Sequence, residues 1–466
     1  MEGRNITSFE ETTIAAISTA MSASGIGIVR ISGPEAFEVA SEVYRSKGGK
    51  KMLKNVPSHT IHYGYIYDNE EMVDEVLVMT MRAPRTYTGE DTIEIDCHGG
   101  VLAMQKVLET VLKHGAVIAE PGEFTKRAFL NGRIDLSQAE AVMDVIQSKN
   151  EYALKNSVNQ LKGNVRKTVQ RIREKILYHI AYIESALDDP EHYDLEGYPE
   201  ELEEIVEQES AEIEGLLKSS ADGKIMQEGL KTVILGKPNA GKSSLLNMLL
   251  GEERAIVTDI AGTTRDVLEE YINLHGVTLR VADTAGIRQT EDLVEQIGVT
   301  KAREMAADAD LILYVVDSSK PLDENDRDII KNLLEKKTIV LYSKTDLESA
   351  IKIEEIQEML ELPVIPVSAK EETGVRELEE KIREMFFSGE INFNDEVYIT
   401  NERHRQELIK AKNSLALVKN SIEAGMPEDF FSIDLTDAYE SLGRILGESM
   451  GEDLVNEIFS KFCMGK

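Results

Sequence analysis

The feature that most constrains this chain is a glycine-rich loop of the form Gly236-x-x-x-x-Gly241-Lys242-Ser243. The apolar run 232–235 precedes it and a second apolar run follows it, which is the strand and helix context that such a loop requires. The glycines allow backbone N–H groups to surround phosphate oxygens, and the end of the following helix adds partial positive charge. We expect Lys242 to contact the β- and γ-phosphates and Ser243 to bind Mg²⁺. The loop therefore predicts a nucleotide-binding α/β domain.

Two further motifs offer groups for the γ-phosphate and the metal ion. In Asp283-Thr-Ala-Gly286, Asp283 suits the waters around Mg²⁺, and Gly286 can present its N–H group to the γ-phosphate. Thr263 and Thr264 lie where a switch threonine binds Mg²⁺ once the γ-phosphate orders the loop. We therefore predict that Ser243 and Thr264 are the Mg²⁺ ligands.

The identity of the base is predicted by Ser343-Lys-Thr-Asp346, which ends a later apolar run. The carboxylate of Asp346 can accept hydrogen bonds from N1–H and N2–H of guanine, and adenine does not offer this pair of donors. The motif usually begins with Asn, which ties the base-binding loop to the phosphate loop, so we expect Ser343 to weaken nucleotide affinity. The residues predicted to contact GTP are Asn239, Ala240, Gly241, Lys242, Ser243, Ser244, Thr258, Asp259, Ile260, Ala261, Gly262, Thr263, Thr264, Asp283, Thr284, Ala285, Gly286, Ser343, Lys344, Asp346, Ser368, Ala369 and Lys370.

The chain of 466 residues is too long for one core, and its patterning changes along its length. Residues 1–122 are expected to form an α+β domain, and 123–228 the first segment of a helical domain. Residues 229–386 alternate apolar strands with helical segments, which predicts a P-loop G domain with a mainly parallel sheet. Helical patterning resumes over 387–466. The expected fold class is multidomain α/β plus α, with the G domain inserted into a discontinuous helical domain.

The first helical segment carries two runs of opposite charge. Helical spacing begins at Asp135, which resembles a capping box with Gln138. Residues 189–214 are acidic and predict an amphipathic helix with a solvated outer face. A basic run consists of Lys162, Arg166, Lys167, Arg171, Arg173 and Lys175. This run is either the solvated face of a helix or a local contact for RNA.

The overall charge limits the classes of partner. A net charge of −33 argues against broad non-specific binding to nucleic acid, because such binding needs Lys and Arg to neutralise phosphates. Two cysteines, Cys97 and Cys463, do not suggest a disulfide framework. The sequence has no apolar run of the roughly 18 residues that a membrane span needs, and its N-terminus does not have the pattern of a signal peptide. We expect a cytoplasmic protein without membrane contact.

The group that activates the attacking water is not evident from these motifs. Small regulatory GTPases commonly place Gln directly after Asp-x-x-Gly, and here that residue is Ile287, which has no polar atom in its side chain. The segment 288–295 is one source of a replacement. Charge neutralisation in the transition state needs a cation, for which Arg265, Arg288, an arginine in trans and a metal ion are the alternatives.

Motifs spread along the whole chain resemble one known family. They are Arg30-Ile-Ser-Gly33, Tyr87-Thr-Gly-Glu-Asp91, His98-Gly-Gly100, Pro121-Gly-Glu-Phe-Thr-Lys-Arg-Ala-Phe-Leu-Asn131, the nucleotide motifs above and the terminal Phe462-Cys-Met-Gly-Lys466. With these motifs the chain resembles the MnmE (TrmE) family of bacterial tRNA-modification GTPases over essentially its full length.

This resemblance implies a folate-binding N-terminal domain that also forms a homodimer. The family's contacts with a tetrahydrofolate derivative, 5-formyl or 5,10-methylene, correspond to Arg30, Glu94, Arg133 and Lys466. Some members have Lys in place of Arg133, so the charge is retained but the geometry differs. The family also has a suspected role for the cysteine at position 463 near the folate, whereas Cys463 by itself is more typical of a small buried apolar residue.

The resemblance also implies a GTPase that depends on K⁺ and on pairing of two G domains. The K⁺ ligands correspond to Asn239, Thr258, Ile260 and Thr263, and the residue that orients the water corresponds to Glu295. The implied reaction joins a one-carbon unit and an amine, glycine or ammonium, to C5 of the wobble uridine of certain tRNAs. It is shared with the flavoprotein MnmG in a heterotetramer. A ribosome-assembly switch and a folate enzyme regulated by GTP are the alternative functions.

Overall fold

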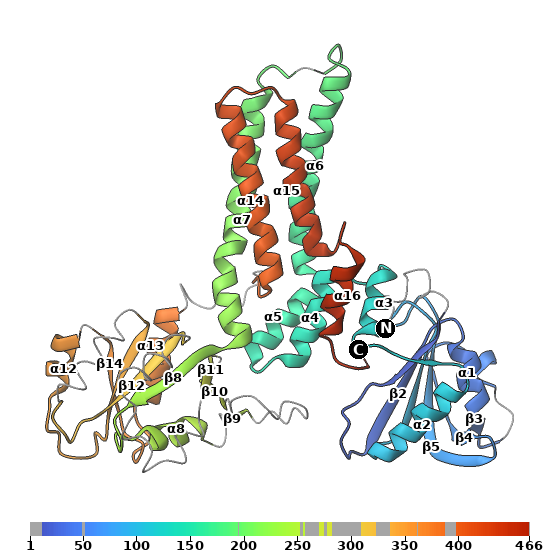
Figure 1. Cartoon of the computed structure of the whole chain (residues 1–466), viewed down its shortest axis with the longest axis horizontal. Helices are drawn as coiled ribbons and strands as arrows, with labels where there is room; N and C mark the ends of the chain where they lie inside the picture. Colours follow the sequence, from blue (N-terminus) through green and yellow to red (C-terminus); the bar gives the residue numbers. More distant parts are fainter. Residues whose placement is uncertain are drawn as a thin grey trace. The chain divides into compact units, whose positions relative to one another are not determined.

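The structure, a computed structural model, describes residues 12–48, 52–193, 195–251, 255–256, 270–274, 277–281, 309–322, 336–360, 362–386 and 398–465 (Figure 1). The chain divides into two compact units. The first unit comprises residues 1–143, 160–195 and 425–466, and the second comprises 144–159 and 196–424.

Seven described strands of the first unit form one sheet in the order β3-β4-β5-β6-β2-β1-β7, antiparallel except for the parallel pair β1 and β7. Helices α1 and α2 cover one face of the sheet (Figure 1). Its other face carries the exposed side chains of Ile61, Tyr63 and Leu77. Buried and exposed residues alternate along β5, because successive side chains of a strand point to opposite faces of the sheet. The elements are β1 (Ile14–Ile17), β2 (Ile26–Ser32), α1 (Ala36–Val43), β3 (Tyr44–Ser46), η2 (Leu53–Asn55), β4 (Thr60–Asp68), β5 (Glu71–Met81), β6 (Thr92–His98), α2 (Val101–Lys113) and β7 (Val117–Ile118).

Helices complete the first unit. The predicted capping box is confirmed, since the N–H of Gln138 donates to Asp135 Oδ1 at 3.0 Å and the N–H of Asp135 donates to Gln138 Oε1 at 3.2 Å. Helices α6 and α15 pack along each other, and Arg173 of α6 donates two hydrogen bonds of 2.7 and 2.6 Å to Glu448, which follows α15. The helices are α3 (Glu123–Leu130), α6 (Asn164–Asp188), α15 (Asp429–Leu446) and α16 (Glu452–Ser460), while α4 (Leu136–Gln147) and α5 (Glu151–Leu161) continue across the boundary between the units.

The second unit contains a sheet of seven described strands in the order β14-β13-β12-β8-β11-β10-β9. Neighbours among β8, β11, β12, β13 and β14 pair in parallel, and β9 and β10 pair antiparallel. Every residue of β12 and β13 is buried, as strands covered on both faces should be. The expected fold class is therefore confirmed. The strands are β8 (Leu230–Gly236), β9 (Ala255–Ile256), β10 (Glu270–Leu274), β11 (Val277–Val281), β12 (Leu311–Asp317), β13 (Thr338–Ser343) and β14 (Val364–Val367).

The helices of this unit are α7 (Tyr198–Glu228), α8 (Lys242–Leu250), α12 (Ile353–Leu360), α13 (Val375–Phe386) and α14 (Glu402–Glu423). Helix α7 is the amphipathic helix expected from the acidic run, with Leu202, Val206 and Ile213 buried. It begins at Tyr198 rather than within the start of that run, because Gly197 has a φ of +77° and a proline occupies the first turn. No helix among the described residues is long and apolar enough to cross a membrane.

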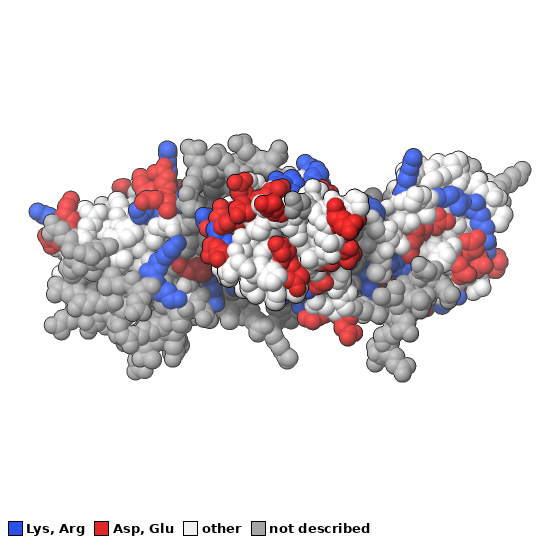
Figure 2. Space-filling model, turned by 90° about the horizontal axis from the view of Figure 1, so that it is seen from above, with Lys and Arg blue, Asp and Glu red and all other residues white. Residues whose placement is uncertain are grey.

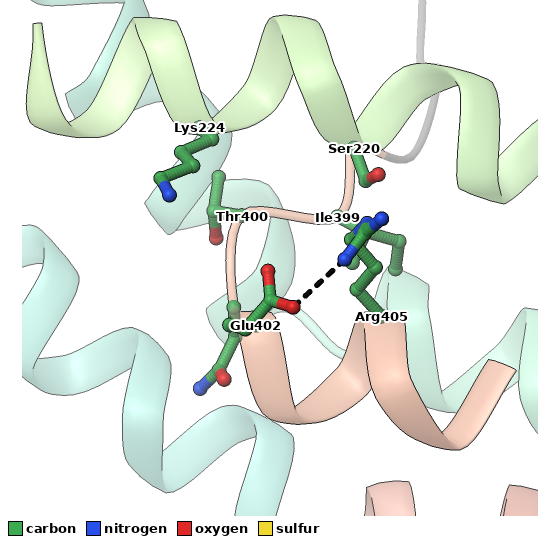
Figure 3. Close-up of a pocket in the computed structure, with 7 residues that line it drawn as sticks. Ser220, Lys224, Ile399, Thr400, Glu402 and Arg405 are labelled. Atoms are coloured by element: carbon green, nitrogen blue, oxygen red, sulfur yellow. Dashed lines mark hydrogen bonds and ion pairs between the residues drawn. The ribbon is translucent and has the colours of Figure 1, made fainter. Parts of the chain in front are cut away.

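Helix α7 meets the segment that precedes α14. A Cβ atom on Gly223 would lie 2.6 Å from the carbonyl oxygen of Ile399, so the two backbones approach closely. Beside this crossing is a cavity of about 170 Å³ (Figure 3). The Nη1 of Arg405 donates to Glu402 at 2.8 Å there, and Lys224 faces the same space. The crossing therefore depends on the absence of a side chain at position 223.

We expect Gly223→Ala to destabilise the second unit, because the new methyl group would overlap the carbonyl oxygen of Ile399. This atom belongs to the backbone and cannot move without displacing the chain. Overpacking of this kind costs about 1 to 3 kcal/mol, to be measured as a lower free energy of unfolding in urea. Gly215→Ala is the matched control, since Gly215 lies in the same helix and a Cβ atom there would have no neighbour within 4 Å. It should be neutral or stabilise by up to about 1 kcal/mol. Equal effects of the two substitutions would contradict the close crossing.

Candidate functional site

The phosphate loop follows β8 and leads into α8. Gly236 has a φ of +148° and Gly241 a φ of +105°, values that side chains rarely allow, and Asn239 also has a positive φ of 60°. The Nζ of Lys242 donates to the carbonyl oxygens of Gly236 at 2.8 Å and Lys237 at 2.6 Å, which holds the ammonium group within the loop. Burial lowers the pKa of Lys242, and a bound phosphate would favour its charged form. The loop thus has the conformation and the charge that phosphate binding needs.

Lys344 joins the base-binding loop to the phosphate loop. Its Nζ donates to the carbonyl oxygen of Asn239 at 2.8 Å and to Asp317 Oδ2 at 2.7 Å. Ser343, buried at the end of β13, lies against Gly241, where a Cβ atom would be 2.8 Å from the Ser343 Oγ. The connection expected of an Asn at this position is therefore made by Lys344, and the effect of Ser343 on affinity stays a prediction.

Asp317 is a residue of this site that sequence reasoning missed. Burial opposes its charge, but hydrogen bonds from Lys344 and Ser319 outweigh that effect and lower its pKa. The signal was present in the sequence, because Asp317 ends an apolar run just as Gly236 and Ser343 do.

The residues predicted to contact guanine follow β13 and β14. Asp346 Oδ1 accepts a hydrogen bond of 3.0 Å from the Ser368 hydroxyl, and the Lys370 Nζ lies 3.8 Å from Asp346 Oδ2. Ser368 also pairs with Thr373 as an isolated β-bridge. The structure therefore brings Asp346, Ser368 and Lys370 together at the edge of the sheet where the phosphate loop begins.

Other predicted residues of the nucleotide site lie outside the described residues. They are Thr258, Asp259, Ile260, Ala261, Gly262, Thr263, Thr264, Asp283, Thr284, Ala285, Gly286 and Glu295. Of the two predicted Mg²⁺ ligands, Ser243 is described, and it stands exposed in the first turn of α8. Among the described residues there is no group of three or more His, Cys, Asp or Glu side chains suited to a metal ion.

A second cluster surrounds Arg30 in the first unit. The Arg30 Nε donates to Glu94 Oε1 at 2.7 Å, and these residues are direct partners across β2 and β6. The guanidinium carbon of Arg30 lies 5.5 Å from the ring centre of Tyr87 and 5.4 Å from that of Phe124. The guanidinium carbon of Arg133 lies 4.9 Å from the ring centre of Tyr87. Two of the four predicted folate residues thus lie over one aromatic ring, and a third, Glu94, is paired with Arg30. Sequence reasoning missed the roles of Tyr87 and Phe124.

The last residues of the chain complete this cluster. The Arg30 Nη1 donates to the carbonyl oxygen of Gly465 at 3.2 Å, and the N–H of Gly122 donates to that of Cys463 at 3.3 Å. A Cβ atom on Gly465 would lie 2.4 Å from the carbonyl oxygen of Ile17, so only glycine allows this approach. Lys466 lies outside the described residues. The end of the chain is therefore placed beside Arg30.

The motif Pro121 to Asn131 has a structural role in this arrangement. Arg127 is buried at the centre of a network in which it donates to Glu123 at 2.9 Å, to Glu90 at 3.1 Å and to the carbonyl oxygen of Thr12 at 2.8 Å. Removing one partner of such a buried pair leaves an uncompensated charge, so the network fixes α3 against the strands. This positions Phe124 beneath Arg30.

The two cysteines differ in their surroundings. Cys97 is buried in β6, where burial and the nearby charge of Asp74 raise its pKa to about 11. Cys463 is exposed, contrary to the expectation that it is a small buried residue. Both are free thiols.

Comparisons with known proteins identify the family of the chain. A family model of the MnmE helical domain matches residues 136–463, and a family model of the GTP-binding protein TrmE N-terminus matches residues 13–133. The tRNA modification GTPase MnmE of Lachnoclostridium phytofermentans is 58% identical over 97% of this chain and 99% of its own length. The protein of the same name from Staphylococcus haemolyticus is 49% identical over 97% of this chain and 99% of its own length.

Among solved structures, the G domain of the T. maritima FeoB iron transporter is 30% identical to this chain. The match covers 33% of this chain and 97% of that domain with a TM-score of 0.26, which is too low to support an inference.

At pH 8 we expect a thiol reagent such as DTNB to modify Cys463 rapidly and to leave Cys97 unmodified in the folded protein. The thiolate is the reactive form, and a pKa near 11 makes it rare at Cys97. Mass spectrometry of labelled peptides measures the site of modification. Cys463→Ser should abolish the rapid phase, and labelling of Cys97 at a comparable rate would contradict the buried environment.

Proposed function

Because the chain belongs to the MnmE family of tRNA modification GTPases, we propose that it uses GTP hydrolysis to drive modification of the wobble uridine of certain tRNAs. It is a GTP-hydrolysing enzyme of tRNA modification. The observation that carries the proposal is the placement of Lys242, Lys344 and Asp346 at one edge of a parallel sheet. The product we propose carries a carboxymethylaminomethyl or aminomethyl group at C5.

The nucleotide site binds GTP through two separate recognition steps. Lys242 contacts the β- and γ-phosphates, while Asp346 accepts the N1–H and N2–H groups of guanine. Lys370 and Ser368 already contact the carboxylate of Asp346, which keeps it oriented. Ser243 fits Mg²⁺, because its exposed hydroxyl stands at the start of α8, and Thr264 is the second proposed ligand. The ion, when bound, neutralises phosphate charge.

Hydrolysis needs a water-orienting group and a further cation. We assign the orientation of the water to Glu295, the residue that the family resemblance implies, because Ile287 at the usual position of Gln has no polar atom in its side chain. For the second we propose K⁺, held by Asn239, Thr258, Ile260 and Thr263 when two G domains pair. The fit rests on Asn239, whose side chain is exposed in the phosphate loop and offers the amide oxygen that K⁺ binds.

The cluster around Arg30 is proposed to bind a tetrahydrofolate derivative, 5-formyl or 5,10-methylene. Folate carries carboxylates and a pterin ring with N–H donors, and the cluster offers cations at Arg30 and Arg133 and an acceptor at Glu94. Tyr87 provides an aromatic surface between the two arginines. Lys466 is the fourth proposed contact. Folate supplies the one-carbon unit, and Cys463 is a further candidate for a catalytic role because it is exposed near this cluster.

The proposed assembly is a homodimer that joins an MnmG-type flavoprotein in a heterotetramer and acts on tRNA in the cytoplasm. The uncovered face of the first unit's sheet supports the homodimer. Ile61 is 63% exposed, and Tyr63 and Leu77, which are direct partners across β4 and β5, are 41% and 43% exposed. Contiguous apolar side chains of this kind mark protein interfaces.

The proposed domains are 1–122 for folate binding and dimerisation, 123–228 and 387–466 for the helical domain and 229–386 for the G domain. The two compact units divide the helices differently, since α6 and α15 belong to the first unit and α7 and α14 to the second. Each helix pair therefore belongs to the same compact unit as a different sheet.

Asp346→Asn should lower GTP affinity by about a hundredfold or more, because two charge-assisted hydrogen bonds to guanine are lost. Calorimetry with GTP and Mg²⁺ measures this loss. In cells that lack this protein, wild type should restore the modified wobble nucleoside in tRNA, whereas Asp346→Asn should not. Lys370→Ala is the control, since its exposed ion pair with Asp346 is weak and its loss should change affinity less than about threefold. Unchanged GTP affinity in Asp346→Asn would refute the assignment.

Arg30→Ala should abolish measurable binding of 5-formyltetrahydrofolate in calorimetry and leave GTP affinity unchanged, because Arg30 contacts Glu94 and lies near Tyr87. Arg45→Ala is a matched control in the same sheet. Arg45 also lies over a tyrosine, 4.2 Å from the ring centre of Tyr67, but at the opposite edge strand. Folate affinity should be unaffected by this change. Absence of folate binding by wild type would overturn the folate proposal.

A further inference from the structure

The basic run of α6 is not used by the GTP site or by the folate cluster, and the structure divides its cations by role. Arg173 is structural. Its side chain is 8% exposed, donates to both carboxylate oxygens of Glu448 and lies 4.1 Å from the ring centre of Tyr439. Arg166 lies 3.8 Å from Asp135. The partners of Arg173 and Arg166 account for only these two cations of the basic run.

The other cations of α6 lie to one side of its buried residues. Val165, Val169 and Ile172 face the core, whereas Lys167 and Arg171 are exposed. Residues four apart on a helix lie on the same side, about 6 Å apart along its axis. Lys175, which is half-buried, extends the row by another turn, and Arg171 and Lys175 also make contacts within the protein.

Aromatic side chains continue the row. Tyr178 is 63% exposed, and its ring stacks on that of Tyr182 with centres 6.5 Å apart and planes at 22°. Tyr193 contacts Tyr182 edge-on at 6.0 Å. We call Lys167, Arg171, Lys175, Tyr178 and Tyr182 the α6 outer face. It combines three cations with the exposed ring of Tyr178, which stacks on Tyr182.

The charge of this face is a local exception in an acidic protein. No Asp or Glu stands between Glu151 and Glu174, although the chain has a net charge of −33. The exposed Glu174, three residues from Arg171 and four from Tyr178, is the one acid between Lys167 and Tyr182. Figure 2 shows Asp and Glu gathered in clusters on the face drawn there, with Lys and Arg in small separate groups. A polyanion is therefore the partner whose charge the α6 outer face complements.

We propose that the α6 outer face binds a single-stranded stretch of the substrate tRNA, with Lys167 and Arg171 contacting phosphates and Tyr178 stacking on an unpaired base. Phosphates give affinity that depends on salt, and an exposed aromatic ring adds stacking on a base. An acidic protein would complement the cations but would offer no base to the ring. This inference rests on the proposed function, because it takes tRNA as the substrate.

The test is tRNA binding by the full-length protein, measured by fluorescence anisotropy at several salt concentrations. Lys167→Glu combined with Arg171→Glu should weaken binding at least tenfold and reduce the slope of log affinity against log salt by about 1.4 to 1.8, which corresponds to two lost phosphate contacts. Tyr178→Leu should weaken binding at least about fivefold, and Tyr178→Phe should retain it, because Phe preserves the stacking surface.

A control variant with Lys106→Glu and Arg376→Glu has the same change in net charge at exposed helical positions elsewhere. It should bind tRNA like wild type. If the double variant of the α6 outer face does not fold, Lys167→Glu and Tyr178→Leu are each tested singly. All variants should keep the wild-type GTPase rate, since all of these residues lie outside the nucleotide motifs.

Unchanged tRNA affinity in the α6 outer face variants would overturn the inference. Loss of flavoprotein binding with retained tRNA affinity would also overturn it and would assign the surface to a protein partner. Failure of the wild-type protein to bind tRNA would also overturn the inference. The proposed function has a separate readout, because restoration of the modified nucleoside in cells would support it even when the isolated protein does not bind tRNA.

Discussion

The parallel register of β8, β12 and β13 is the constraint on which the nucleotide site depends. Gly236 at the end of β8 pairs with Val315, and Asp317 at the end of β12 pairs with Ser343 at the end of β13. Because parallel strands end at the same edge of the sheet, the loops that follow them meet there. Lys344 then joins these loops through Asn239 and Asp317. The loops predicted to bind the phosphates and the base are therefore parts of one connected structure.

The first unit brings distant segments together by a different means. Its sheet is mainly antiparallel, and the cluster around Arg30 is completed by the last residues of the chain rather than by a strand end. This requires glycine at positions 122 and 465, where backbone atoms of other segments lie within 2.6 Å of the place a Cβ would take. The buried network of Arg127 holds α3 in place beneath the cluster. Changes at the end of the chain should therefore act on the same site as changes at Arg30.

Several local features could be predicted from the sequence because their causes are local. The capping box of Asp135 and Gln138 forms in both directions, since the two residues are held three positions apart by the helix itself. The apolar runs of β12 and β13 predicted strands buried on both faces. The contacts of Arg30 with Gly465 and with Tyr87 could not be predicted in the same way, because the sequence distance between partners carries no information about their separation in space.

The sequence by itself determined the nucleotide motifs, the fold class and the positions of the parallel strands β8, β11, β12, β13 and β14, because these depend on residue type and on patterns a few residues long. Tertiary structure decided what each charge does. Arg173 and Lys167 stand in one basic run, yet Arg173 is buried against Glu448 and Lys167 is exposed, since a helix turns successive residues to different sides. In the same way Asp317 became part of the nucleotide site because parallel pairing placed the end of β12 beside Lys344.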